Sequence, residues 1–406
     1  MAEVNRLAAK LKQRDFKLNA LLEITKTINA NLPIDRLLAE YERVLREELL
    51  IEKVALFARG EHWNSILQYG VSDELEKVVT DENFFKGQQV SLLSGNKSES
   101  FDIVIPVYQD GQAIAYLLVG DEQEQEVKIS PVIKHMRFIE TLTNVLVVAI
   151  ENRRLAQDRL RQERVKKELE LAAEMQAILL PQSLPKTNEF EVSAVYKAHQ
   201  QVGGDYYDFL ILDEDEVMFC MADVSGKGVS AAFLMANFQA YLRSIFSYRK
   251  GDLKEIVVEL NERVMISAMG EKYITLFLAT YQKSTRELKY INCGHNPPVL
   301  ADSEGYTQLL KLGSIGLGMF DELPKVAMGE VKLSPNSLIV CYTDGLVETE
   351  NDQDKEFGVE RLEQVMLSSF DQNVASINRN VVDAVNTYKG TRPFIDDLAI
   401  LTCRFF

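Results

Sequence analysis

Residues 217–236 read VMFCMADVSGKGVSAAFLMA, which is an apolar run, an aspartate, a glycine-containing turn and a second apolar run. The first run, 217–221, has the length and composition of a buried strand. The glycines within 225–228 predict a turn that leads into a helix from about Ala231. Asp223 is therefore predicted to lie at a strand end, immediately ahead of a helix.

Three further aspartates stand beside apolar runs of the same kind. Asp205 lies in the motif GGDYYD, Asp344 follows the run 338–342, and Asp396 precedes the run 398–401. Each motif alone is weak, because aspartate is common in turns and can simply cap its neighbours. Carboxylates at strand ends can nevertheless converge at one edge of a sheet sandwich, where they repel each other unless cations neutralise them. The pattern predicts a divalent-metal site.

Composition describes an ordinary globular protein. The 406 residues allow two or three domains, and 46% are hydrophobic while 26% are charged. The formal charge of −16 argues against a nucleic-acid partner. There is no signal-peptide core, and the longest apolar stretch, 145–150, is too short to span a bilayer. Four isolated cysteines favour buried, reduced thiols. We therefore expect a cytoplasmic protein without membrane insertion.

Residues 1–30 are predicted to form a helix, since they lack Gly and Pro and are rich in Leu, Ala, Lys and Glu. A heptad-like spacing runs through Leu7, Leu11, Arg14, Leu18, Leu21, Thr25 and Ile28. Two alternatives fit this spacing. The helix forms a dimer seam, or it lies along the following domain.

Residues 31–150 are predicted to form a separate α/β unit. A helical stretch, strands near 54–57 and 65–69, a hairpin around Gln109-Asp110-Gly111 and a closing helix follow in order. This order resembles a GAF domain, which implies a small-ligand sensor, with a cyclic nucleotide as one ligand class. The hairpin can equally be scaffold with no ligand between its strands.

Residues 151–181 are predicted to be a linker helix continuous with the closing helix, because no Gly or Pro occurs before Pro181. An apolar heptad stripe passes through Leu142, Leu146, Ala149, Arg153, Ala156 and Leu160, and restarts out of phase at Val165, Leu169, Ala172, Gln176 and Leu179. The stripe predicts a parallel coiled coil with a stutter, hence a homodimer. A solvated interdomain helix is the alternative.

Residues 182–406 alternate predicted strands and helices. Expected strands are 190–196, 217–221, 274–281, 288–292, 337–342 and 398–403, and expected helices are 231–248, 253–269, 359–370 and 374–388. Strands 274–281 and 288–292 are joined by a short polar turn. Such adjacent pairs favour antiparallel sheets covered by helices, and hence an α+β fold.

Six motifs in this half resemble the metal-dependent PPM (type-2C) serine/threonine phosphatases, in their bacterial SpoIIE-like branch. They are EMQAILLP (174–181), VGGDYYDF (202–209), ADVSGKGVSAAFLMA (222–236), NCGHNPPVL (292–300), YTDGLVETEN (342–351) and DDLAIL (396–401). The resemblance implies a PPM-type β-sandwich flanked by helices. The upstream GAF-like unit and linker resemble members that regulate bacterial partner-switching pathways.

The resemblance also implies a ligand set of two Mn²⁺ or Mg²⁺ ions held by catalytic aspartates and one backbone carbonyl. These residues are Asp205, Asp223, Val224 (carbonyl), Asp344 and Asp396. Hard cations prefer such oxygen ligands, and no His/Cys set here suits zinc. Asp208 and Asp397 are expected in supporting roles. Gly203 and Gly204 are expected to let the backbone pass close to the ions.

How phosphate is held is left open by the sequence, because the arginine that larger family members place ahead of the first metal aspartate is absent. Lys197, the metal ions alone, and Lys227 are the candidates, although a solvated lysine is the plainer interpretation of Lys227. His295 suits a proton donor to the leaving oxygen or, more simply, a structural histidine bonded to its loop.

The sequence thus predicts a protein serine/threonine phosphatase whose substrate, by resemblance, is a phosphorylated anti-sigma-factor antagonist. The linker helix ends beside the catalytic half, so its rotation or shift is expected to regulate activity through Gln176 and Leu179. The alternative is a ligand-sensing docking protein with a catalytically degenerate phosphatase module. Four intact aspartates speak against that alternative.

Overall fold

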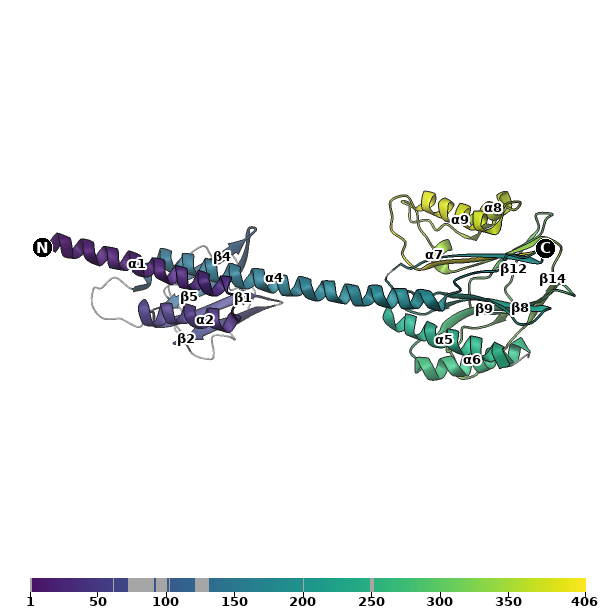
Figure 1. Ribbon diagram of the computed structural model, residues 1–406, viewed down its shortest axis with the longest axis horizontal. Coiled ribbons are helices and arrows are strands. Elements are labelled where there is room, and N and C mark those ends of the chain that lie inside the picture. Colours follow the sequence, from purple (N-terminus) through teal and green to yellow (C-terminus); the bar gives the residue numbers. More distant parts are fainter. Residues whose placement is uncertain are drawn as a thin grey trace. The chain divides into compact units, whose positions relative to one another are not determined.

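The computed structural model describes the chain in eight stretches: residues 2–60, 62–71, 91–92, 101, 103–120, 131–199, 201–248 and 252–406. Its contacts divide the chain into two units, Met1–Glu163 and Arg164–Phe406. Figure 1 labels many of the elements of both.

In its described residues, unit 1 contains one antiparallel sheet and four helical elements. The helical elements are α1 (Ala2–Asn29), α2 (Ile34–Arg43), a π-helical turn (Val44–Glu48) and the first part of α4 (Pro131–Leu179). The strands are β1 (Lys53–Arg59), β2 (Trp63–Tyr69), β3 (Ser91–Leu92), β4 (Ile103–Gln109) and β5 (Gln112–Gly120). Their order in the sheet is β2-β1-β5-β4-β3.

The predicted hairpin of unit 1 is confirmed by β4 and β5. Asp110 and Gly111 join the strands with φ angles of 50° and 79°, both in the left-handed region that a two-residue hairpin turn favours. Residues 72–90, 93–100 and 121–130 of the predicted GAF-like unit lie outside the described residues. The GAF resemblance stays a prediction.

The second half of α1 packs on the core of unit 1. Ala20 and Ile24 are buried there, and the heptad positions Leu21 and Ile28 pack against the same core. The alternative in which the helix lies along its domain therefore holds for this half. The heptad leucines Leu7 and Leu11 in the first half are exposed, and so is Leu18 on the outward side of the second half.

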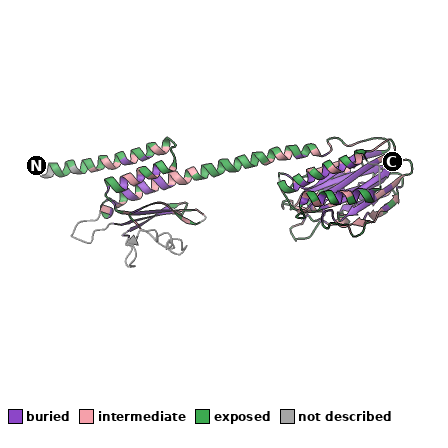
Figure 2. Ribbon diagram, turned by 90° about the horizontal axis from the view of Figure 1, so that it is seen from below, coloured by how far each residue is buried: buried purple, intermediate pink, exposed green. Residues whose placement is uncertain are grey.

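Helix α4 is continuous over 49 residues, which confirms the predicted unbroken helix. Leu142 and Leu146, where the heptad stripe begins, are buried in the core of unit 1. This start of the stripe is therefore core and not a dimer seam, because its leucines pack against the sheet. Residues 154–168 are all exposed, as the green stretch of α4 in Figure 2 illustrates.

Unit 2 is a sandwich of two sheets with helices on both outer faces (Figure 1). One sheet has the order β13-β10-β9-β8-β7, with β14 also paired to β10, and the other has the order β12-β11-β15-β16-β6. The strands are β6 (Phe190–Lys197), β7 (Tyr206–Ile211), β8 (Glu216–Val224), β9 (Ile274–Gln282), β10 (Glu287–Cys293), β11 (Val299–Ala301), β12 (Thr307–Leu309), β13 (Gly313–Ser314), β14 (Gly329–Lys332), β15 (Ser337–Tyr342) and β16 (Leu398–Phe405). The helices are α5 (Val229–Tyr248), α6 (Leu253–Ala268), α7 (Asp344–Val347), α8 (Val359–Ser368) and α9 (Val374–Lys389).

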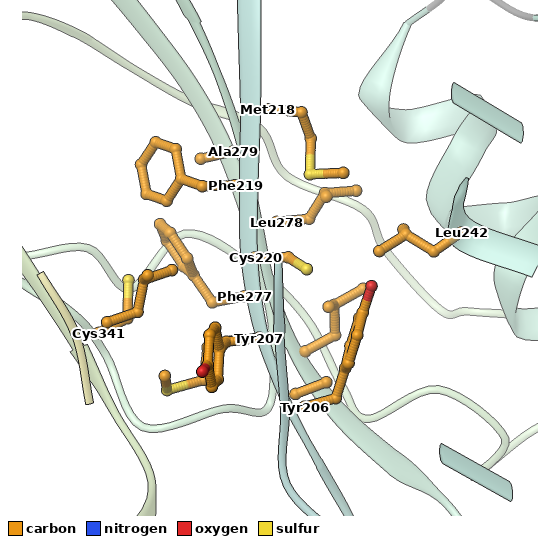
Figure 3. Close-up of a cluster of buried hydrophobic side chains, with 14 of the residues drawn as sticks. Tyr206, Tyr207, Met218, Phe219, Cys220, Leu242, Phe277, Leu278, Ala279 and Cys341 are labelled. Atoms are coloured by element: carbon orange, nitrogen blue, oxygen red, sulfur yellow. The ribbon is translucent and has the colours of Figure 1, made fainter. Parts of the chain in front are cut away.

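Both faces of β8 are covered, which explains its uninterrupted apolar sequence. Figure 3 shows Phe219 on the same side of the sheet as Phe277, while Met218 and Cys220 lie on the side of Leu242 from α5. Side chains of a strand alternate between its faces, so a strand between a second sheet and a helix needs apolar residues at every position.

The six strands and four helices predicted for residues 182–406 are all present, with ends within a few residues of those expected. The sequence did not predict β7, in which the polar Asp208 interrupts the apolar pattern, or α7, which spans one turn. It also did not predict β11 to β14, which are two to four residues long and too short for a periodic signal.

The four cysteines are buried and unpaired, as predicted. None of the described helices combines the length and apolarity that a membrane crossing needs.

Candidate metal centre

The four predicted aspartates come from both sheets of unit 2 and lie at one edge of the sandwich. Asp205 directly precedes β7 and Asp223 is the penultimate residue of β8, both in the first sheet. Asp344 begins α7 after β15, and Asp396 lies two residues ahead of β16, both in the second sheet. The hydroxyl of Thr343 bridges the sheets by donating to Asp205 Oδ2 at 2.8 Å.

Burial and mutual repulsion raise the pKa of three of these carboxyl groups. Burial, followed by the charges of Asp223 and Asp397, raises the pKa of Asp205 well above its usual range. Burial, followed by Asp344 and Asp396, raises the pKa of Asp223 to about 7. Burial and the charge of Asp396 raise the pKa of Asp344. Carboxylates that disfavour each other's ionised form in this way are stabilised by a cation among them.

The donor set fits a hard divalent cation by its chemistry, since it consists of carboxylate and carbonyl oxygens. A Cβ built on Gly204 would lie 2.9 Å from the Val224 carbonyl oxygen and 3.4 Å from Asp223 Oδ1, so this carbonyl lies beside the aspartates. Across the described stretches, no three His, Cys, Asp or Glu side chains are grouped closely enough to hold one ion. The closure of these ligands around two ions therefore stays a prediction.

At Gly203 and Gly204 the backbone passes close to the aspartate cluster, as expected for these glycines. Gly203 lies against Asp397, and Gly204 lies against Asp223 and Val224. A Cβ on Gly203 would lie 2.0 Å from the Tyr196 hydroxyl oxygen and 2.2 Å from Asp397 Oδ2. Together with the Gly204 contacts to the end of β8, this leaves no room for a side chain on either residue.

Asp208 connects β7 to α5 through its side chain. It is fully buried, and both of its oxygens accept hydrogen bonds from Arg243, at 2.7 and 3.1 Å. The Tyr206 hydroxyl donates to Asp208 Oδ2 at 2.5 Å, and the Phe209 N–H donates to Oδ1 at 2.9 Å. The geometry agrees with the supporting role expected for Asp208.

The ammonium group of Lys227 contacts the cluster. Its Nζ lies 2.7 Å from Asp396 Oδ2 and donates to the Ile395 carbonyl at 2.7 Å. The interpretation of Lys227 as a merely solvated lysine is therefore wrong, because the acidic surroundings attract its ammonium group. Lys197 instead places its Nζ 5.9 Å from the centre of the Phe394 ring, a cation–π contact.

His295 lies inside the sandwich, only 5% exposed. Its Nδ1 is 3.0 Å from Thr275 Oγ1, and its backbone N–H donates to Asn292 Oδ1 at 2.8 Å. Burial lowers the pKa of His295 to about 4, so the ring is neutral at pH 7. A buried, neutral ring favours the structural alternative over proton donation to a leaving group.

Two residues of the site were not predicted from the sequence. Thr343 accepts the Ala399 N–H at 2.9 Å while it donates to Asp205, and no sequence signal distinguishes it beyond its place before Asp344. Glu348 lies one helical turn after Asp344, and burial together with the charge of Asp344 raises its pKa. The i, i+4 spacing of these two acids is the signal that points to Glu348.

The end of α4 contacts the segment that carries Asp205. The Gln176 amide donates to the Gly203 carbonyl at 2.6 Å and accepts the Gly203 N–H at 3.1 Å. Leu179 packs against the core of unit 2, and its carbonyl accepts from Gln239 at 3.3 Å. The predicted coiled-coil stripe is corrected at this end, because Gln176 and Leu179 are engaged within unit 2 and not available to a second chain.

Comparison with known proteins assigns a family to the second half of the chain. Residues 213–406 match the family model described as Stage II sporulation protein E (SpoIIE). Protein IcfG of Synechocystis is 28% identical over 261 residues, which are 58% of this chain and 41% of that protein. Phosphoserine phosphatase RsbU of Bacillus subtilis is 28% identical over 227 residues, which are 53% of this chain and 65% of RsbU. The chain thus spans less than two thirds of either relative.

Solved structures show the same fold. The SiaA-PP2C domain of Pseudomonas aeruginosa superposes with a TM-score of 0.54 at 23% identity, over 61% of this chain and 99% of that domain. The RsbU and RsbW domains of a Mycobacterium tuberculosis protein superpose with a TM-score of 0.50 at 21% identity, over 56% and 63%. Residues 213–406 therefore match the SpoIIE family model and lie in a unit with the PPM-type (PP2C) phosphatase fold.

Proposed function

We propose that unit 2 is a metal-dependent phosphatase that hydrolyses phosphate monoesters on serine or threonine of a protein. The observation that carries the proposal is the meeting of Asp205, Asp223, Asp344 and Asp396 from two sheets. Burial and repulsion raise the pKa of the first three of these carboxyl groups. The SpoIIE family match and the relative named phosphoserine phosphatase support it.

In this proposal the four aspartates and the Val224 carbonyl hold two Mn²⁺ or Mg²⁺ ions. When bound, such a pair of ions neutralises the phosphoryl oxygens and supplies an activated water for in-line attack. The chain's own residues keep the ligands in place: Thr343 orients Asp205, and the backbone at Gly204 passes close enough to bring Asp205 beside Asp223.

We further propose a phosphorylated anti-sigma-factor antagonist as the substrate, in a bacterial partner-switching pathway. The support is the resemblance of the motifs and the similarity to RsbU. The buried, unpaired cysteines suit a reducing compartment such as the cytoplasm. No nucleic-acid partner is proposed, in keeping with the formal charge of −16.

Hydrolysis by the full chain is expected to require added divalent metal. We expect release of phosphate from p-nitrophenyl phosphate and from a phosphoserine protein in excess Mn²⁺, and loss of activity with a chelator. Absence of hydrolysis at any Mn²⁺ or Mg²⁺ concentration would contradict the enzyme proposal. It would favour the second candidate, a ligand-sensing docking protein with a degenerate phosphatase module.

We propose that α4 also mediates a homodimer, through a face next to the one that unit 2 covers. Leu171, Met175 and Ile178 follow a four–three spacing and are 58%, 65% and 72% exposed. Apolar side chains this exposed on one helix face are typical of a coiled-coil seam. Sedimentation of the full chain tests this seam, since a monomer at micromolar concentration contradicts it.

Unit 1 is proposed to bind a small ligand, on the strength of its GAF-like sequence order alone. Calorimetric titration of the full chain with cyclic nucleotides tests the one ligand class suggested by the sequence. In this proposal the ligand acts through α4, which is continuous from unit 1 into unit 2.

Regulation is proposed to pass through Gln176, and replacing it by Ala is expected to lower kcat by about tenfold. The substitution removes two hydrogen bonds to Gly203, and about 1.4 kcal/mol of lost positioning corresponds to that factor. Leu179→Ala should act in the same direction, because Leu179 packs the helix end on the core of unit 2.

Gln182 provides the matched control for this prediction. Its amide also lies at the end of α4, but it donates to the carbonyls of Ala177 and Leu180 and not to Gly203. Gln182→Ala is expected to keep the wild-type kcat. If the Gln176 and Leu179 variants retain both wild-type turnover and wild-type Mn²⁺ affinity, the switch proposal is wrong.

A further inference from the structure

Two adjacent aspartates precede β16, and their side chains have different partners. Asp396 is 36% exposed at its side chain and pairs with Lys227 through Oδ2. Asp397 is buried, at 9% exposure, and accepts the His199 N–H on Oδ1 at 2.8 Å and the Gly204 N–H on Oδ2 at 2.7 Å. Each Asp397 oxygen is thus already engaged by the backbone of the segment that leads into Asp205.

The position of Gly204 decides where Asp205 lies, because the two residues are adjacent in the chain. Gly204 is held on one side by the Asp397 carboxylate and is in close approach to Val224 on the other. Movement of Gly204 away from Asp397 would therefore carry the Asp205 carboxylate out of its present place beside Asp223.

A second connection runs from the same part of β16 to the Asp205 side chain itself. Thr343 Oγ1 donates to Asp205 Oδ2 at 2.8 Å and accepts the Ala399 N–H at 2.9 Å. Hydrogen bonds thus connect both the backbone ahead of Asp205 and the Asp205 carboxylate to residues at the start of β16. A carboxylate that accepts two backbone N–H groups is a strong, geometrically defined link, since its bonds are charge-assisted.

We propose that Asp397 is a positioning residue: its carboxylate fixes the backbone at His199 and Gly204 so that Asp205 is presented to the divalent cations. The inference rests on the proposed function of the site and adds a residue to it. Replacing a group that orients a metal ligand without binding the metal typically lowers the metal affinity by about 10- to 100-fold. Asp397 acts in this way on Asp205 without being a ligand itself.

The test is Mn²⁺ affinity of the full chain, measured by calorimetry, for the wild type and for Asp397→Asn. The amide keeps one acceptor oxygen but turns an NH₂ group toward the other backbone N–H, so the link to His199 or Gly204 is lost. We expect a Kd for Mn²⁺ at least about tenfold higher. Excess Mn²⁺ should restore most of the kcat, and the His199 and Gly204 amides should exchange with solvent faster.

Asp215 offers a matched control, because it also accepts a loop N–H but lies at the other end of β8 from Asp223. Its carboxylate takes the Ser284 N–H at 2.7 Å, the Ser284 hydroxyl at 2.6 Å and the Gln282 amide at 3.1 Å. Asp215→Asn is expected to leave the Mn²⁺ affinity unchanged. An equal loss of affinity in both variants would mean general destabilisation and would overturn the proposal.

A Mn²⁺ affinity of Asp397→Asn within about threefold of the wild type also overturns the proposal, whatever the amide exchange. A wild-type chain that binds no Mn²⁺ and hydrolyses no phosphate ester overturns the proposed function, and this inference with it. If Asp397→Asn does not fold, Asp397→Glu keeps the charge and shifts the carboxylate by one methylene. The same loss of Mn²⁺ affinity is expected for Asp397→Glu. If the His199 and Gly204 amides of the wild type exchange freely with solvent, their hydrogen bonds to Asp397 are contradicted.

Discussion

Replacement of Asp223 by Asn is expected to abolish metal-dependent hydrolysis while it stabilises the metal-free protein above neutral pH. Activity should fall by about a thousandfold or more, because a charged group placed at the reacting centre is lost. Stability should rise because, in the absence of a cation, the Asp223 carboxylate is buried and is also repelled by Asp344 and Asp396. Opposite effects on activity and stability are expected for a carboxylate that binds the metal ions and does not stabilise the fold.

The pH dependence follows from the raised pKa of Asp223. Its folded value of about 7 lies above the ordinary value of 3.8, so between these values the folded state binds more protons than the unfolded state. Raising the pH through this window therefore lowers the free energy of unfolding of the metal-free protein, on the order of 3 kcal/mol for this group. Asn carries no such dependence.

Urea unfolding of the wild type and Asp223→Asn, with chelator present, measures this effect at about pH 5 and about pH 8. The variant should be similar to the wild type at the lower pH and more stable at the higher one. Added Mn²⁺ should stabilise the wild type by mass action and leave the variant nearly unchanged. A variant less stable than the wild type at the higher pH would show that Asp223 is not repelled by its neighbours.

Replacement of Gly345 by Ala is expected to reduce activity by about a hundredfold or more, since a misplacement of about 1 Å at a reacting centre costs that much. A Cβ on Gly345 would lie 2.0 Å from the Asp397 carbonyl oxygen, 2.9 Å from the Asp397 carbonyl carbon and 3.2 Å from that of Asp396. These are backbone atoms of the two residues ahead of β16 and cannot rotate away. The turn of α7 would have to move, and Asp344 moves with it.

The unfolding free energy of Gly345→Ala should fall by about 1–3 kcal/mol, the usual cost of an overpacked contact. Gly305→Ala is the matched control in the turn between β11 and β12. Gly305 has φ +85° with no atom within 4 Å of a built Cβ, so the change costs about 1–2 kcal/mol of backbone strain without touching the aspartates. Gly345→Ala with activity within threefold of the control would contradict the close packing.

Much of unit 2 could be predicted from the sequence because its elements carry strong local patterns. The run 217–222 is apolar at every position, which is typical of a strand covered on both faces, and Figure 3 shows that arrangement. Asp223, Asp344 and Asp396 were predictable because each adjoins an apolar run, whereas Asp205 was singled out by its GGDYYD motif. Strand ends can meet at a sheet edge, so local strand signals carry information about a distant site.

The partners of individual side chains could not be predicted in this way. Asp396 and Asp397 are chemically identical neighbours, yet one pairs with Lys227 and the other accepts backbone N–H groups about 190 residues earlier in the chain. The same holds for the linker stripe, whose first leucines are buried in unit 1 while Gln176 bonds to Gly203. Heptad spacing identifies an apolar face and says nothing about what covers it.

The sequence by itself determined the longer strands and helices of unit 2, the unbroken α4 and the choice of four aspartates as candidates, because these depend on local composition and spacing. Only the tertiary structure decided that Lys227 neutralises Asp396, that Thr343 orients Asp205, and that Asp397 holds the backbone at Gly204. The physical reason is range. Propensity and periodicity act over a few residues, whereas hydrogen bonds and charges act between any groups that the packing of the two sheets brings together.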